Sequence, residues 1–290
     1  MRVRTPKRIR ATTIFCLLIG GVGLAGCETN PYTGRWQLLM TSVSQEMQMG
    51  TQAYNQIKTD PKMRLSQDPS EIEPVKRIAA RIVEAAKRSK YAEMAQQFQW
   101  EVSVIKDDKT ANAFALPGGK MAVYTGIFPM AKTEAGLAAV MGHEVVHALA
   151  RHGAERMSQG QAANIGLKVV GAAIGLSGGN PMLGQATMAA LGAGAQVGIL
   201  LPFSRKHESE ADYVGILLAA DAGYDPRESV ALWERMGQAS GGGGSAEFLS
   251  THPSHDTRID QLKEWMPEAM AIYQKKTPIP AAPLPEVGGR

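Results

Sequence analysis

The chain has 290 residues, of which 44% are hydrophobic and 20% are charged, a composition typical of a globular protein and not of a disordered one. Its formal net charge is +4, and the first 26 residues hold five basic residues and no acidic one. Removing those five from the 31 basic residues leaves 26 against 27 acidic residues, which excludes a strongly basic surface for nucleic acid.

The first 26 residues are predicted to be a lipoprotein signal peptide. A basic stretch ends at Arg10, an apolar run follows, and Leu24-Ala25-Gly26-Cys27 resembles a bacterial lipobox, in which cleavage precedes a cysteine that is then lipidated. An ordinary signal peptide or an N-terminal membrane anchor is the alternative. Lipid on Cys27 would anchor the chain to a membrane, and Glu28, in place of an inner-membrane retention aspartate, implies the periplasmic side of the outer membrane.

The mature chain is expected to divide into three parts. Residues 27–44 are predicted to be a lipidated tether, because Asn30-Pro31-Tyr32-Thr33-Gly34 has turn chemistry. Residues 45–274 are expected to form one domain, with a first helix from about Ser44 to Lys58 and a second that begins at Pro74, a residue suited to a first turn. The proline-rich tail, residues 275–290, is expected to be disordered or extended.

Two strands are predicted before the middle of the chain. Apolar and polar residues alternate from Trp100 to Val104, and a short apolar run follows the turn at Pro117-Gly118-Gly119. If the second strand has a free edge, an extended peptide could pair with it, so Gly119, Met121 and Val123 are candidate substrate-strand residues. The alternative is an ordinary core hairpin.

Residues 143–147 read His-Glu-Val-Val-His, the H-E-x-x-H pattern, within a segment that is predicted to be a helix capped by Thr133. His143 and His147 are four residues apart, so on a helix their imidazoles lie on one face and can bind one metal ion. Zn²⁺ is the usual metal of such a site. Glu144 is then placed to take a proton from a water that the metal activates.

Residues 169–203 contain no charged side chain and are rich in glycine and alanine. The sequence favours two helices of small residues packed against the core. A transmembrane hairpin is the alternative, but each arm is short or interrupted by polar residues.

A catalytic zinc needs a third protein ligand. Glu208 and Asp212 are also four residues apart, so Glu208 can bind the metal while Asp212 accepts the spare N–H of a ligand imidazole, that of His143. Glu210 points elsewhere on the same helix and is the weaker candidate.

The combination of H-E-x-x-H with S-R-x-x-E-x-x-A-D at residues 204–212 resembles the family-48 zinc metallopeptidases, which include HtpX, the CAAX prenyl proteases and periplasmic proteins of the BepA and LoiP type. The resemblance covers residues 40–272, and the lipobox and residues 30–34 are most similar to the lipoprotein members. It implies an α-rich α+β gluzincin fold with a small sheet, one Zn²⁺ on His143, His147 and Glu208, and endopeptidase activity in envelope protein quality control.

The resemblance also includes Thr251-His252-Pro253 and Arg258. It implies that His252 approaches the zinc and switches or inhibits the enzyme, and that Arg258 lies in the cleft. His252 and Arg258 are therefore candidate catalytic residues beside Glu144, placed either to stabilise an oxyanion or to occlude the site. The other histidines, His152, His207 and His255, are predicted to lie at the surface or at helix ends.

The sequence thus predicts a zinc endopeptidase that cuts misfolded or stalled envelope proteins in extended segments. One alternative is a chaperone or assembly factor for outer-membrane proteins with a latent metal site. Another is a metal-binding lipoprotein that stabilises the envelope without chemistry. The presence of Glu144 argues against the first alternative, because a purely structural zinc needs no base beside it, and an open, water-bearing coordination site would count against the second.

Overall fold

The structure is a computed structural model that describes residues 27–162, 203–239, 246–252 and 257–288. The described strands are β1 (Cys27–Thr29), β2 (Trp36–Leu38), β3 (Glu101–Ile105), β4 (Ala113–Leu116) and β5 (Lys120–Tyr124). The described helices with assigned bounds are α2 (Val43–Thr59), α3 (Pro69–Ala86), α4 (Ala92–Gln97), η1 (Thr125–Ile127), α5 (Phe128–Ala131), α6 (Glu134–Leu149), α9 (Arg205–Asp221), α10 (Arg227–Ala239), α11 (Ala246–Thr251) and α12 (Arg258–Tyr273). This is the α-rich α+β class that the sequence predicts.

Two predictions fall on residues outside these ranges. The signal peptide is one, and the small-residue helices of residues 169–203 are the other, apart from Phe203. No helix in the part of the chain that the structure describes has both the length and the apolar composition that a bilayer span requires.

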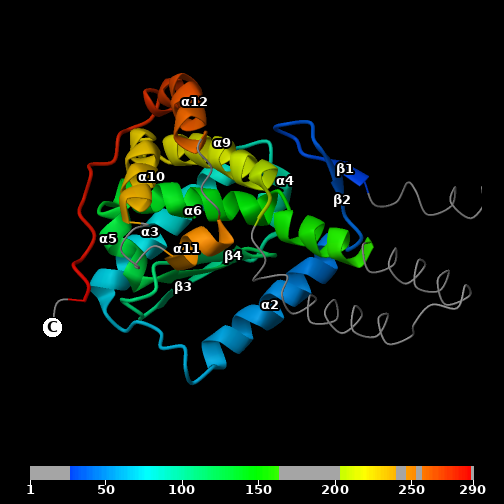
Figure 1. Cartoon of the computed structure of the whole chain (residues 1–290), viewed down its shortest axis with the longest axis horizontal. Coiled ribbons are helices and arrows are strands. Elements are labelled where there is room, and N and C mark those ends of the chain that lie inside the picture. The colour runs from blue at the N-terminus through cyan, green and yellow to red at the C-terminus, as the bar shows by residue number, and fades with distance from the viewer. Residues whose placement is uncertain (1–26, 163–202, 240–245, 253–256, 289–290) are drawn as a thin grey trace, which may run out of the picture.

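Helix α6 forms the centre of the fold (Figure 1). The side chain of Thr133 accepts a hydrogen bond from the backbone N–H of Gly136, which caps the helix as predicted. Every residue of α6 is buried, because α3, α9, α10 and β4 all pack against it. A helix that is covered on all sides belongs to the core, so the motif that it carries lies inside the protein.

Helices α6 and α9 approach each other closely at two glycines. A Cβ atom on Gly142 would lie 2.9 Å from the carbonyl oxygen of Gly215, and one on Gly215 would lie 3.0 Å from the backbone nitrogen of His143. Neither position can therefore hold a larger residue without moving the helices apart. The crossing brings the first turn of α9 beside the histidines of α6.

The three-stranded sheet has the order β3-β5-β4, with β3 parallel and β4 antiparallel to β5. The two predicted strands, β3 and β5, are present, but the sequence did not reveal β4. The prediction that Gly119, Met121 and Val123 pair with substrate is wrong. Both edges of β5, the central strand, are occupied, and the backbone groups of Gly119 bond to Leu116 and Glu101. The apolar tetrapeptide of β4 lacks the alternation that marks a strand in a sequence.

The first two long helices begin at capped residues. The side chains of Ser42 and Gln45 form a capping box at the start of α2. Helix α3 begins at Pro69 after Asp68, whose side chain accepts a hydrogen bond from the backbone of Ser70. The predicted start at Pro74 is wrong, and this proline lies inside the helix. Because proline has no N–H, the carbonyl of Ser70, four residues earlier, has no intrahelical donor. Ser70 is exposed, so water can bond to this carbonyl instead.

The two ends of the described chain are ordered against the domain. Residues 27–38, expected to belong to a tether, instead form the antiparallel pair β1–β2 with register Cys27 to Leu38, at one end of the molecule (Figure 1). The C-terminal tail is extended, as one of the predicted alternatives, and the N–H of Leu284 donates to the carbonyl of Lys132. We call residues 27–38 the N-terminal hairpin.

Candidate metal centre

Four side chains converge where α6, α9 and the segment after α11 meet. One ligand atom from each of His143, His147, Glu208 and His252 lies within 4.8 Å of all the others. All four residues are buried, with at most 3% of their surface exposed. The structure therefore brings together the three predicted ligands and adds His252 to them.

The two α6 histidines face each other as their spacing requires. Their Nε2 atoms are 3.0 Å apart, and each lies 3.4 Å from one carboxylate oxygen of Glu208. Ser204 caps α9 by accepting a hydrogen bond from the N–H of His207, which places Glu208 in the first helical turn. The carboxylate thus spans the two imidazoles.

Asp212 and Arg258 hold this arrangement in place from the His143 side. The Oδ1 atom of Asp212 lies 2.9 Å from Nδ1 of His143. The guanidinium of Arg258 donates to Asp212 at 2.6 Å and to Glu208 at 3.1 Å, and stacks over the ring of Trp233. Because its two terminal nitrogens bond to carboxylates and its side chain is buried, Arg258 is placed to orient Glu208 and Asp212.

The donor set fits a zinc ion. An N–H of His143 that bonds to Asp212 leaves the Nε2 lone pair directed at the cluster, which is the form a metal needs. Burial lowers the pKa of His143, but the charge of Glu208 and hydrogen bonds with Asp212 and Glu208 raise it to about 9. The same negative charge that attracts a proton there would attract a cation. Two imidazoles and a carboxylate are a common ligand set of catalytic zinc.

Glu144 lies beside the cluster with one oxygen uncommitted. Its Oε1 atom is 3.3 Å from Nε2 of His252 but has no hydrogen-bond partner, while the backbone N–H of Ala115 donates to the carboxylate. Burial raises the pKa of Glu144, against the opposing charges of His252 and His143. A carboxylate with a raised pKa is a stronger base than an ordinary one, which suits it to take a proton from water.

His252 closes the cluster on the remaining side. Its Nδ1 atom lies 3.2 Å from both His143 Nε2 and Glu208 Oε1. The rings of Phe203 and Phe248 stack on its imidazole, with centroids 5.3 Å and 4.5 Å away. His252 therefore occupies the position next to Glu144 that a substrate needs.

His152 and His207 lie at the starts of helical segments, as one of the two predicted alternatives, and not at the surface, which was the other. Both are buried, and their rings stack with centroids 4.5 Å apart. Burial lowers the pKa of His152 to about 4, against the opposing hydrogen bond with Glu210. Their burial could not be predicted from the sequence, because the carboxylates that accept their hydrogen bonds, Glu210 and Glu155, lie on separate helical segments. His255 lies outside the described residues.

The edge of β4 faces the motif helix. The backbone N–H of Tyr124 donates to the carbonyl of Asn112. In the antiparallel register, the backbone N–H and C=O groups of Phe114 then point toward β5, and those of Ala115 point away from it. Within the described residues, no strand pairs with this outer edge of β4. Its backbone groups therefore lie next to Glu144.

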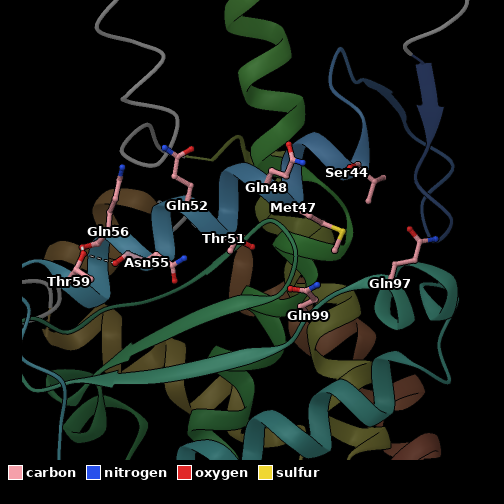
Figure 2. A pocket seen from close by; sticks show the side chains of 11 residues that line it. Ser44, Met47, Gln48, Thr51, Gln52, Asn55, Gln56, Thr59, Gln97 and Gln99 are labelled. Atoms are coloured by element: carbon pink, nitrogen blue, oxygen red, sulfur yellow. Dashed lines mark hydrogen bonds between the residues drawn. The ribbon is translucent and has the colours of Figure 1, made fainter.

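A separate cavity of about 750 Å³ lies along α2 (Figure 2). Its lining is formed by one face of that helix together with Gln97 and Gln99, and amide and hydroxyl side chains predominate. None of the described residues that line it is charged or a histidine, so these residues offer no acid, base or strong metal ligand.

Comparison with known proteins supports the chemistry of this cluster. The family model described as Peptidase family M48 matches residues 71–266. The chain is 39% identical over 270 residues to the mitochondrial metalloendopeptidase OMA1 of Schizosaccharomyces pombe, covering 91% of this chain and 74% of the relative. It is 31% identical over 259 residues to the beta-barrel assembly-enhancing protease of Escherichia coli O157:H7, covering 87% of this chain and 51% of the relative.

The family match contains all the residues on α6 and α9 that form the cluster, and of the relatives named above one is a metalloendopeptidase and the other a protease. Both observations agree with a buried His-His-Glu site that has a further carboxylate, that of Glu144, at its side. This chain belongs to peptidase family M48 and is a metalloendopeptidase.

Proposed function

We propose that this metalloendopeptidase uses zinc and acts in the bacterial cell envelope, where it cleaves misfolded or stalled envelope proteins from a lipid anchor on Cys27. The observation that carries the zinc assignment is the buried set of His143, His147 and Glu208 with Glu144 alongside. The envelope assignment rests on the lipobox-like sequence before Cys27 and on the similarity to the beta-barrel assembly-enhancing protease.

The roles of the residues follow from their contacts. Zinc held by His143, His147 and Glu208 would polarise the scissile carbonyl and activate water. The free Oε1 atom of Glu144 receives the proton of the attacking water and passes it to the departing amine. Asp212 keeps the proton of His143 on Nδ1, which leaves its other nitrogen available as a ligand.

The substrate would be bound as an added strand on the outer edge of β4, in place of the β5 edge that the sequence predicted. Ala115 directs its backbone groups away from β5 and toward Glu144. Backbone hydrogen bonds select for extended chain and not for particular side chains, which suits a protease of unfolded proteins.

The test is digestion of casein by the purified full-length chain and by its Glu144→Gln variant, each with and without a chelator. We expect fragmentation by the unaltered chain alone, abolished by the chelator and restored by added zinc. Equal fragmentation by the Glu144→Gln variant would remove Glu144 as the base and identify the activity as a contaminant.

The second candidate is an assembly factor whose metal site is latent, and the position of His252 favours it. His252 contacts two metal ligands and Glu144 and is covered by two phenylalanine rings. Under this hypothesis the unaltered chain leaves casein intact, whereas His252→Ala cleaves it. If neither form cleaves while both bind zinc, His252 is not what keeps the site latent, and both candidates as stated are overturned.

A further inference from the structure

The N-terminal hairpin makes an extensive set of polar contacts with the core, and one of its targets is Glu210. This carboxylate accepts hydrogen bonds from Thr33 at 2.5 Å, from the guanidinium of Arg35 at 2.8 Å and from the amide of Asn30 at 3.3 Å. Glu210 is buried, so these donors replace the water that would otherwise solvate its charge. All three donors lie in the Asn30–Arg35 loop that joins β1 to β2.

Glu210 is connected to the metal centre through one further side chain. Its Oε2 atom lies 3.0 Å from Nε2 of His152, and Nδ1 of His152 lies 3.1 Å from Nδ1 of His147. The path therefore runs from the loop to Glu210, then to His152, and ends on the nitrogen of His147 that faces away from the cluster.

The carboxylate of Glu210 determines which atom donates and which accepts in each hydrogen bond of this path. A carboxylate surrounded by donors can only accept, so the Nε2 atom of His152 carries the proton that it donates to Glu210. A neutral His152 then has its lone pair on Nδ1, and His147 must donate its own Nδ1–H to it. The Nε2 atom of His147 is left with a lone pair that faces the metal ligands.

We propose that the Asn30–Arg35 loop is a positioning element of the metal site, which sets the tautomer and orientation of His147 through Glu210 and His152. This inference rests on the proposed metal site. It gives the Asn30–Arg35 loop a role in that site, whereas the proposed function does not otherwise involve this loop. The segment directly after the proposed lipidation site is thereby a working part of the enzyme, and displacement of the hairpin weakens metal binding.

The neighbouring His207 provides an internal comparison. It is also buried, stacks on His152 and bonds to a carboxylate, Glu155, which Arg35 also contacts at 2.6 Å. Among the described residues, no hydrogen bond or ring contact joins His207 to His147, whereas His152 makes both. Replacing either ring by phenylalanine preserves much of the stack, but only the replacement of His152 removes the acceptor of the His147 proton.

The experiment measures the zinc dissociation constant of the full chain by competition with a chromogenic chelator, together with the unfolding midpoint of each metal-free variant. His152→Phe and Glu210→Gln are expected to weaken zinc binding by about 10- to 100-fold, the range for partners that orient a ligand. Arg35→Gln is expected to weaken it by roughly 3- to 10-fold, because it acts one step further away.

Two matched controls separate positioning from general stability. His207→Phe is paired with His152→Phe, and Arg77→Gln, which breaks an arginine–glutamate pair at the other end of α6, is paired with Arg35→Gln. Both controls are expected to bind zinc within about twofold of the unaltered chain, even where their unfolding midpoints fall. If the His152→Phe variant fails to fold, the Glu210→Gln variant provides the test, because glutamine is nearly the same size as the glutamate that it replaces.

The outcomes distinguish the inference from the function on which it rests. Equal weakening in each variant and its control, in proportion to lost stability, would overturn the positioning role. Weakening in Glu210→Gln without any in Arg35→Gln would overturn the part assigned to the loop. Absence of zinc binding in the unaltered chain would overturn the metal site itself.

Discussion

The two histidine ligands are supported in different ways on the two sides of the cluster. On one side, Asp212 contacts His143 directly and Arg258 joins Asp212 to Glu208. On the other, the Nδ1 atom of His147, which faces away from the cluster, is linked to a carboxylate only through His152, and the arginine that holds this carboxylate comes from the N-terminal hairpin. The first side is built within the helical core, whereas the second depends on a segment near the chain terminus.

This difference separates a fixed side from an adjustable one. The side chain of Arg258 is 1% exposed, while that of Arg35 is 18% exposed. Water can replace part of what Arg35 supplies but little of what Arg258 supplies, because desolvated charges depend on their protein partners. The His143 side is therefore expected to carry stability, and the His147 side to respond to what happens at the hairpin.

Glu208→Gln should abolish zinc binding, because it removes the ligand that contacts both histidines. The difference between the two sides would then have no effect on the metal. The neutral amide lacks the charge that draws a cation between the two imidazoles. Zinc at about 100 times the dissociation constant should stabilise the unaltered chain by about 2.7 kcal/mol. The variant should show no zinc-induced rise in its unfolding midpoint, and an undiminished rise would contradict the assignment of Glu208 as a ligand.

Arg258→Met should destabilise the protein on the His143 side of the cluster. The substitution leaves Glu208 and Asp212 buried without their guanidinium, and removal of one partner from a buried pair costs about 3–5 kcal/mol. Chemical unfolding of the metal-free variant measures this loss. Zinc should recover part of it, since a cation compensates Glu208. A loss no larger than that of Arg35→Met would remove the distinction between the two sides.

The sequence predicted the fixed side because its residues follow helical spacing. The pairs His143 and His147, and Glu208 and Asp212, are each four residues apart, and this geometry is a property of any α-helix. The resemblance to family 48 supplied His252 and Arg258. The overall class was also predictable, because the long amphipathic helices and two of the three strands of the main sheet have clear patterns.

The adjustable side was not predictable, for a physical reason. Glu210 and Arg35 are 175 residues apart, and a turn-forming sequence such as that of the hairpin loop indicates a connection but not what it contacts. After α6, Arg151 has a positive φ of 56°, which redirects the chain before His152. No glycine or proline stands at this break, so the sequence does not predict it. The side chain of Arg151 compensates for this conformation through its bonds with Glu46.

Gly215→Ala should disturb both sides together, and more mildly. The new methyl group would lie 3.0 Å from the backbone nitrogen of His143, so α9 must shift away from α6. Such overpacking typically costs about 1–3 kcal/mol and here also displaces Glu208 from the imidazoles. Unfolding and zinc affinity should fall in parallel. Gly237→Ala, where no atom lies within 4 Å of the new Cβ, is the matched control and should retain both.

Arg88→Ala sets the scale for an ion pair that has no connection to the cluster. Arg88 bonds to Asp221 at the end of α9, but its side chain is 51% exposed and Lys276 also pairs with the same carboxylate. An exposed pair with a second cation at hand contributes less than about 1 kcal/mol. Chemical unfolding should detect little change, and the zinc dissociation constant should stay the same. A weakening of zinc binding comparable to that of Arg35→Gln would mean that any lost arginine on these helices disturbs the metal, and the hairpin would then have no special role.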